Sequence, residues 1–206
     1  MPSELGDCLN GPVRRFLLRC TVGLYTCDWL GVPRIVGSAV CLECKSGYSL
    51  ITAAHVLGTD LKKGLYLRPG EKHDALISLH QCRIATLHKQ DRHVDLAVIL
   101  LSSEIAGRFH PNTYWLDGED ILDDEAVDLD FWPGNSVGIK GRKVSQPTPK
   151  GLSGGGIWIL TERPTKQSPV MLVGIQHRWH KTLHSLRGTR IVGLTEEIEP
   201  AHREVK

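Results

Sequence analysis

Residues 150–160, KGLSGGGIWIL, decide between fold classes because one serine stands among glycines and the chain then runs directly into apolar, β-branched residues. A Walker-type phosphate loop needs a lysine after its glycines and a helix behind it, and neither follows here. Residues 151–155 formally match the Gly-x-Ser-x-Gly turn of an α/β-hydrolase, but that turn also enters a helix. Because Ile157, Trp158 and Ile159 favour a strand, the stretch is predicted to be a loop that enters a β-strand.

The rest of the 206-residue chain has the same β-rich character, with short apolar runs separated by glycine, proline and charged turns. About six strands are predicted before Ser102, from RFLLRCTVGLY, RIVGSAVCLEC, YSLITAAHVL, GLYLRP, DALISLHQCRIATLH and VDLAVILL. A polar connector spans about residues 103–124, and a second set follows from AVDLDFW, GGIWIL, VMLVGIQHRW and TRIVGL. Many short strands in two groups favour an all-β barrel or sandwich over alternating strands and helices. LTEEIEPAHREVK at the C-terminus predicts a helix, because acidic residues lie at its start.

Charge and hydropathy exclude several classes of partner. The formal net charge of +2 is too small to indicate nucleic acid, and Arg14 and Arg15 are interpreted as solvated surface. No apolar run approaches the roughly 20 residues that cross a bilayer, so no membrane partner is expected. Arg19 interrupts the apolar run after the arginine pair, so this segment is not interpreted as a secretory signal, and a cytoplasmic protein is expected.

The six cysteines are expected to be free and buried, because no secretory signal precedes them. Cys41 and Cys44 form a C-x-x-C pair, which is the spacing of many zinc and redox sites. No second pair of ligands at metal-binding spacing accompanies it, and the pair lies within a strand-like run. The sequence therefore predicts no metal and no cofactor.

A serine hydroxyl is a poor nucleophile unless an imidazole takes its proton and a carboxylate orients the imidazole. His55 follows the small residues Ala53 and Ala54 at the end of an apolar run, and Asp95 opens the apolar run DLAVILL. A carboxylate beside so much apolar surface is costly unless it is hydrogen-bonded. The order His55, Asp95, Ser153 is one of the known orders of a catalytic triad.

The α/β-hydrolase interpretation requires the acid and the histidine to follow the serine. Only residues of the short C-terminal tail, such as Glu199 and His202, are available for those roles, and nothing in their surroundings distinguishes them. The predicted parallel sheet of that fold is also missing.

The motifs TAAH, DLAVI and GLSGG, in this order, resemble those of the trypsin-like, chymotrypsin-fold serine peptidases. The resemblance runs from about Arg15 to the final helix, and DFWPG is similar to a strand and turn of many bacterial members. It implies one peptidase domain of all-β class, with two antiparallel six-stranded β-barrels over about residues 15–102 and 120–194 and a C-terminal helix over 195–206.

By the same resemblance, Ser153 is the nucleophile, His55 the general base and acid, and Asp95 the orienting carboxylate. The backbone N–H groups of Gly151 and Ser153 would form the oxyanion hole. Both N–H groups must point toward one oxygen, which requires backbone angles that a side chain would obstruct, and this explains the glycines. The expected activity is that of a serine endopeptidase acting on protein or peptide substrates, without a cofactor and with a regulatory protein as a further partner. A silent relative that uses the same scaffold to bind a peptide or partner is the alternative.

Several positions depart from the family pattern. Leu152 replaces the aspartate that pairs with a new N-terminus in activated zymogens, so competence without such a cut is expected. Val56 replaces the cysteine that commonly follows the catalytic histidine, so the usual disulfide is absent.

The specificity pocket departs from the trypsin pattern as well. Pro147 stands at its base, where trypsins have aspartate. Gln176, His177 and Arg178 fall on a pocket-wall strand, where the histidine and arginine either favour an acidic substrate residue or point outward.

Overall fold

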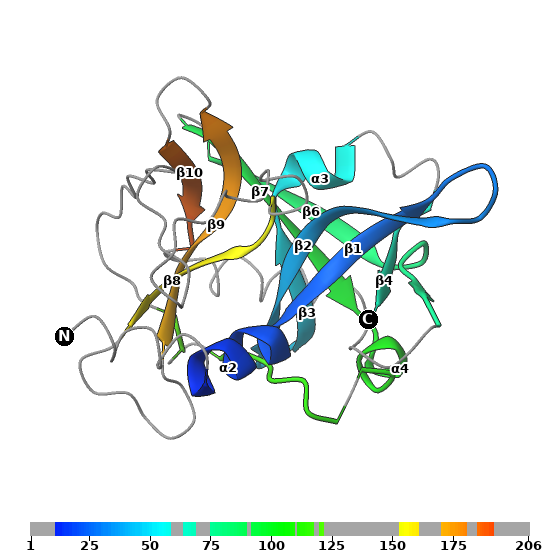
Figure 1. Cartoon of the computed structure of the whole chain (residues 1–206), viewed down its shortest axis with the longest axis horizontal. Helices are drawn as coiled ribbons and strands as arrows, with labels where there is room; N and C mark the ends of the chain where they lie inside the picture. The colour runs from blue at the N-terminus through cyan, green and yellow to red at the C-terminus, as the bar shows by residue number, and fades with distance from the viewer. Residues whose placement is uncertain are drawn as a thin grey trace, which may run out of the picture.

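The computed structural model describes residues 11–58, 64–68, 75–89, 92–109, 111–117, 120–121, 153–160, 170–180 and 185–191. These residues form a curled seven-stranded sheet, a smaller three-stranded sheet and short helices (Figure 1). The predicted all-β class is confirmed. Two six-stranded barrels are not confirmed, because the described strands divide into seven and three. The run AVDLDFW and the C-terminal helix predicted over residues 195–206 lie outside the described residues.

The larger sheet is antiparallel throughout, and its strands lie in the spatial order β5-β4-β1-β2-β3-β7-β6. Its members are β1 (Thr21–Cys27), β2 (Pro33–Cys44), β3 (Gly47–Thr52), β4 (Tyr66–Arg68), β5 (Ile77–Ser78), β6 (Arg83–Lys89) and β7 (Arg92–Leu101). The predicted run DALISLHQCRIATLH is thus divided between β5 and β6, with a turn between them. This sheet carries most of the described chain before Ser102.

The smaller sheet contains β8 (Gly156–Leu160), β9 (Val170–His180) and β10 (Ser185–Arg190), with β9 in the middle. The serine-containing loop therefore enters a strand, as predicted from its β-branched residues. This outcome contradicts the α/β-hydrolase interpretation, which requires a helix after the serine.

Two apolar clusters form the core. The first, called here the sheet core, lies inside the curl of the larger sheet and joins its two ends. Its members include Val22, Leu24, Ala39, Cys41, Leu50, Leu67, Ile77, Ala97, Ile99 and Leu101. The second, called here the shared core, joins the two sheets and includes Phe16, Val40, Leu42, Ile51, Val98, Leu116, Val170, Leu172 and Ile175. Because β2, β3 and β7 contribute to both clusters, these strands are apolar on both faces.

The segment RFLLRC was predicted to begin a strand, and this prediction is wrong. It forms the helix α2 (Pro12–Cys20), which lies below the two sheets in Figure 1. Its buried and half-buried apolar residues Val13, Phe16, Leu17 and Cys20 follow the three- and four-residue spacing of a helix. Proline at the first position also suits a helix start.

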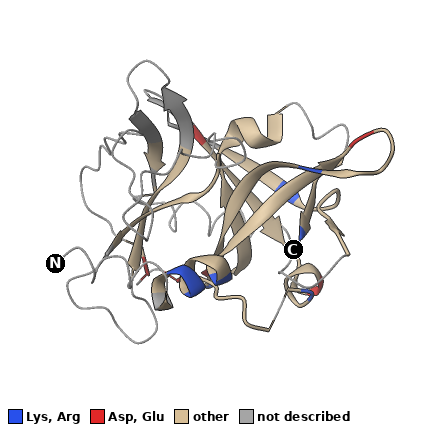
Figure 2. Cartoon of the chain, viewed as in Figure 1, with Lys and Arg blue, Asp and Glu red and all other residues tan. Residues whose placement is uncertain are grey.

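The opposite face of α2 is basic. Figure 2 shows Lys and Arg colouring gathered on this helix, where Arg14, Arg15 and Arg19 are exposed. The Arg19 guanidinium lies over the Tyr114 ring, with its carbon 5.9 Å from the ring centroid. The arginine pair is therefore surface, as predicted.

The connector after β7 contains a short helix, α4 (Ser103–Ala106), which the Ser102 hydroxyl caps by accepting the Ile105 N–H. Further along, Leu116 is fully buried and lies against β2. Its N–H donates to the Cys41 carbonyl at 3.1 Å, and its carbonyl accepts the Glu43 N–H at 2.7 Å. This part of the connector is therefore bound to the sheet.

Cys41 and Cys44 lie on β2, three residues apart, so their side chains face opposite sides of the strand. Cys41 is fully buried in the sheet core, whereas Cys44 packs against the shared core. Neither cysteine forms a disulfide. One metal ion cannot be bound by this pair from the same strand.

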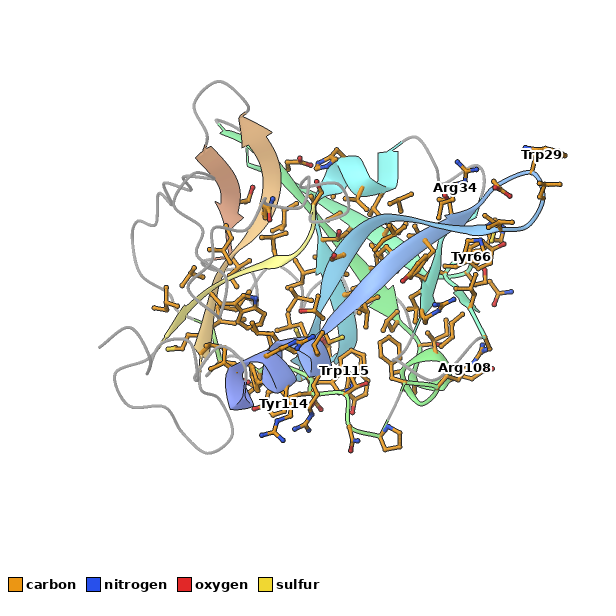
Figure 3. The ribbon with its side chains drawn as sticks, viewed as in Figure 1. Trp29, Arg34, Tyr66, Arg108, Tyr114 and Trp115 are labelled. Carbon is orange, nitrogen blue, oxygen red and sulfur yellow. The ribbon has the colours of Figure 1, made fainter. Side chains whose placement is uncertain are left out.

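The hairpin between β1 and β2 projects from the sheet, with Trp29 at its tip (Figure 3). The Asp28 carboxylate shapes the turn by accepting the backbone N–H groups of Leu30 and Val32 at 2.9 and 3.0 Å. It also pairs with the Arg34 guanidinium at 3.0 Å.

Among the described helices, none has the length and apolar character to cross a membrane.

Candidate active site

His55 and Asp95, which are 40 residues apart in sequence, are in direct contact. The histidine lies in α3 (Ala54–Gly58), a short helix directly after β3, and the aspartate lies in β7. The sequence interpretation that His55 closes a strand is therefore corrected. β3 ends at Thr52, and Ala53 and Ala54 have poor strand propensity.

The Asp95 carboxylate contacts His55 at two points. One oxygen accepts the backbone N–H of His55 at 2.8 Å, and the other lies 2.6 Å from the ring Nδ1. A carboxylate anion can only accept a hydrogen bond, so this geometry fits the tautomer in which Nδ1 carries the proton and donates a hydrogen bond to Asp95. In the neutral imidazole this leaves Nε2 as an acceptor, which is the arrangement a general base requires.

The ring is placed where it can meet a reactant. The His55 side chain is 46% exposed and the Asp95 side chain 26% exposed, so the carboxylate is the more shielded partner. Behind them, Ala53 and Val56 are buried in the sheet core. The residues on either side of the Ala54–His55 step are therefore anchored in the core, while the imidazole itself is accessible.

Ser153 is half-buried in the loop that precedes β8, and the backbone of that loop is held on two sides. Toward β2, the Ser153 carbonyl accepts the Ser38 N–H at 2.8 Å. Toward β9, the Gly154 N–H donates to the Gln176 carbonyl at 2.7 Å, and the Gln176 N–H donates to the Gly155 carbonyl at 2.9 Å. The loop thus bridges the two sheets.

Gly154 has a conformation and surroundings that only glycine fits. Its φ is +85°, in the left-handed region. A Cβ atom at this position would lie 2.0 Å from the Ser38 carbonyl oxygen and 2.1 Å from the Thr52 hydroxyl oxygen. The absence of a side chain therefore lets the loop approach β2 and β3 closely.

Gly37 is the point where the segment with His55 meets the loop with Ser153. A Cβ atom on Gly37 would lie 2.6 and 2.8 Å from the two methyl groups of Val56, and 2.8 Å from the Ser153 carbonyl oxygen. Val56 directly follows His55, so a side chain of the histidine segment and the backbone of the serine loop both lie against one glycine. The structure thus brings the segment that contains His55 and the loop that contains Ser153 together at Gly37.

The remaining predicted site residues are only partly described. Gln176 lies in β9 and is half-buried, and its backbone binds the serine loop. His177 and Arg178 also lie in β9, but their side chains fall outside the described residues, as do Gly151 and Pro147 entirely. The described residues contain no group of three or more potential metal ligands.

Three further residues contribute to the site that the sequence analysis did not identify: Gly37, Ser38 and Thr52. Gly37 interrupts the apolar run RIVGSAVCLEC, and an isolated glycine within a strand often marks a close approach of another backbone. That signal was present in the sequence. No local signal indicates Ser38, because its role depends on a loop more than 100 residues away, at Ser153.

No protein-family model matches this chain, and no curated protein matches it significantly in sequence. Among solved structures, it is similar to the NSP4 proteinase from Equine Arteritis Virus, with 11% identity, a TM-score of 0.44 and coverage of 84% of this chain and 73% of that one. It is also similar to the serine endoprotease from Yersinia pestis, with 12% identity, a TM-score of 0.49 and coverage of 95% and 68%.

A third structure concerns the coupled folding and binding of the intrinsically disordered Sesbania mosaic virus VPg protein, with 15% identity, a TM-score of 0.49 and coverage of 85% and 89%. All three likenesses are distant, and two of these three neighbours are proteases by name.

Proposed function

We propose that this protein is a serine endopeptidase in which Ser153 is the nucleophile, His55 the general base and acid, and Asp95 the orienting carboxylate. The observation that carries the proposal is the two-point contact of Asp95 with His55. His55 is followed directly by Val56, whose side chain lies beside Gly37 together with the Ser153 carbonyl oxygen. An ion pair with only a structural role would not require one carboxylate to hold both the backbone and the ring of a histidine. The His55 side chain is 46% exposed, so the oriented ring is accessible to a reactant.

In the proposed reaction, Nε2 of His55 takes the hydroxyl proton as the Ser153 oxygen bonds to the substrate carbonyl carbon. The negative charge that develops on the carbonyl oxygen is stabilised by the N–H groups of Gly151 and Ser153. His55 then gives its proton to the leaving amine as the peptide C–N bond breaks, which leaves an acyl-enzyme. Water hydrolyses the ester by the same proton route in reverse, and Ser153 is regenerated.

Asp95 contributes by orientation and charge. Its contact with Nδ1 keeps the proton on that nitrogen, and its negative charge stabilises the imidazolium that forms when Nε2 accepts the serine proton. The backbone N–H of His55 holds the other carboxylate oxygen in place, so the oxygen that contacts Nδ1 stays directed at the ring.

A fluorophosphonate probe tests the proposal because it forms a covalent adduct only with an activated serine. The wild-type protein is expected to be labelled at Ser153, as located by peptide mass spectrometry. Labelling should be absent in Ser153→Ala and strongly reduced in His55→Ala, while both variants keep the wild-type circular dichroism spectrum. A folded wild-type protein that reacts no faster than Ser153→Ala would overturn the proposal and favour the silent binding module.

Finer properties are proposed together with the activity. They are two six-stranded barrels over about residues 15–102 and 120–194, a bacterial-type peptidase without the usual disulfides, and a cytoplasmic location with a regulatory partner. Because Leu152 cannot form the ion pair of activated zymogens, the intact chain should be active. An intact chain that is inert until its N-terminus is trimmed would contradict this point.

Substrate preference is proposed to depend on Pro147, Gln176, His177 and Arg178. Proline at the pocket base offers no charge to attract Lys or Arg, so trypsin-like cleavage is not expected. Cleavage profiling with a peptide library separates the two remaining possibilities. A preference for Asp or Glu before the scissile bond means that the basic side chains face the pocket, and its absence means that they point outward.

A further inference from the structure

We infer that Thr52 is a positioning residue for the proposed nucleophile, because its hydroxyl fixes the segment of β2 on which the Ser153 loop docks. This inference rests on the proposed function of the site. The Thr52 side chain is completely buried, and its hydroxyl donates a hydrogen bond of 2.7 Å to the Ser38 carbonyl. The bond joins two residues 14 positions apart, at the end of β3 and within β2.

The bond occurs where the two strands separate. β2 and β3 are paired in register up to Val40 and Ile51, where the ladder between them ends. One residue further along β3, the Thr52 hydroxyl supplies the donor that a backbone N–H would supply in a continuing ladder. The side chain therefore extends the connection between the strands after the backbone ladder has ended.

Both the carbonyl and the N–H of Ser38 form hydrogen bonds at this point. Its carbonyl accepts from Thr52 at 2.7 Å, and its N–H donates to the Ser153 carbonyl at 2.8 Å. The two groups belong to the same residue, so a rotation of the Ser38 backbone that alters one bond also alters the other. Thr52 is in this way connected to the backbone of the proposed nucleophile through one residue.

The serine loop also touches this bond directly. A Cβ on Gly154 would lie 2.0 Å from the Ser38 oxygen and 2.1 Å from the Thr52 oxygen. The backbone of Gly154 therefore packs over the hydrogen bond itself. If the hydroxyl is lost, the Ser38 carbonyl loses this donor, and the surface under Gly154 changes at the same time.

The consequence is specific to the nucleophile. His55 is held by Asp95 of β7, whereas Ser153 is held by Ser38 and by β9. Loss of the Thr52 hydroxyl should therefore shift the serine relative to the imidazole without disturbing the contact between His55 and Asp95. Displacements of about 1 Å at a reacting group can lower a rate by roughly 100-fold, so even a partial shift is measurable.

Three variants test the inference. Thr52→Val removes the hydroxyl at similar volume, Thr52→Ser retains it, and Thr26→Val changes another buried threonine, in β1, as the matched control. For Thr52→Val we expect kcat and the rate of fluorophosphonate labelling, each per folded molecule, to fall about tenfold, with KM for a peptide substrate unchanged. Thr52→Ser should retain the wild-type values within about twofold, and Thr26→Val should leave them unchanged.

A purely structural role for Thr52 would lower thermal stability and leave the rates per folded molecule at wild-type values, which would overturn the inference. Failure of Thr52→Ser to restore the rate would overturn it as well. If Thr52→Val does not fold, Thr52→Ala replaces it, because alanine removes the hydroxyl without placing a methyl group against Gly154.

Amide hydrogen exchange followed by NMR separates this inference from the proposed activity. In Thr52→Val, exchange at the Ser38 N–H should be faster than in the wild type, and in Thr26→Val it should be unchanged. Unchanged exchange at Ser38 in Thr52→Val would overturn the coupling even if the protein is a peptidase. A folded wild type that resists labelling would instead overturn the proposed function.

Discussion

The carboxylate of Asp95 binds the backbone N–H of His55 at 2.8 Å and approaches the ring Nδ1 to 2.6 Å, so one side chain from β7 holds both the main chain and the imidazole of α3. Two contacts fix the position and the rotation of the ring together. The role proposed for His55 as a general base depends on this relationship.

Replacement of Asp95 by asparagine should lower the rate of fluorophosphonate labelling by about 10³- to 10⁴-fold, because the amide cannot accept both His55 protons and favours the wrong tautomer. The fold should be retained, since the two side chains have the same shape. Asp28→Asn is the matched control, because this carboxylate belongs to the hairpin turn. Labelling of Asp95→Asn at the wild-type rate would exclude a role for the carboxylate in activating Ser153.

Gly37→Ala should separate the histidine and serine segments. The new methyl group would lie 2.6 Å from a Val56 methyl and 2.8 Å from the Ser153 oxygen. We expect a loss of about 1–3 kcal/mol in unfolding free energy from urea denaturation, and slower labelling of Ser153. Gly58→Ala is the control, since apart from its neighbours in the chain no described residue has an atom within 4 Å of the added Cβ. Equal behaviour of the two variants would contradict the close approach at Gly37.

Gly154→Ala combines backbone strain with steric overlap, and Gly31→Ala separates the two effects. Both glycines have positive φ, +85° and +77°, but only Gly154 has atoms within contact of an added Cβ. Gly31→Ala should cost about 1 kcal/mol and leave labelling unchanged, as expected for strain alone. Gly154→Ala should cost more and abolish labelling, and a similar small cost in both variants would refute the docking of Gly154 against Thr52.

Acid should weaken the β1–β2 hairpin through Asp28. Its hydrogen bond from the Val32 N–H is the largest cause that lowers the pKa of this carboxyl below 3.8, and the Leu30 N–H and Arg34 lower it further. A group whose pKa is lowered by folding stabilises the fold above its unfolded pKa, and that contribution is lost as pH falls through the folded pKa. The difference in urea midpoint between wild type and Asp28→Asn should therefore be constant near neutral pH and become smaller as the pH falls below 3.8, the usual pKa of an aspartate. A difference that does not vary with pH would contradict the assignment.

The buried thiols should resist alkylation until the protein unfolds. Burial raises the pKa of Cys20 to about 12 and raises the pKa of Cys41 well above its usual range. Because the thiolate is the reactive form, iodoacetamide should modify the half-buried Cys27 in the folded protein while these two cysteines react only in denaturant. Peptide mass spectrometry after timed alkylation measures the rates. Modification of Cys41 as fast as Cys27 would show that β2 is not buried as described.

The β class and the strand after Ser153 could be predicted because they depend on local chemistry. Ile157, Trp158 and Ile159 prefer an extended backbone wherever they lie, and β8 forms there. The first helix was mistaken for a strand because RFLLRC is apolar over a short run, and only the spacing of Val13, Phe16 and Cys20 distinguishes the two structures. Side-chain burial on one face of α2 resolves that ambiguity.

The sequence by itself determined which residue types are available for the chemistry: one serine among glycines, a histidine after small residues and an aspartate at the start of an apolar strand. Their order along the chain also indicated the roles that we propose for them. Only the tertiary structure decided that Asp95 contacts His55 at two points, that Gly37 brings the Val56 and Ser153 segments together, and that Thr52 reaches the serine loop through Ser38. These relationships join segments between 14 and more than 100 residues apart, and they depend on where strands separate and how closely backbones pack. Local propensity cannot encode such distances, because they are set by the packing of the whole chain around its two core clusters.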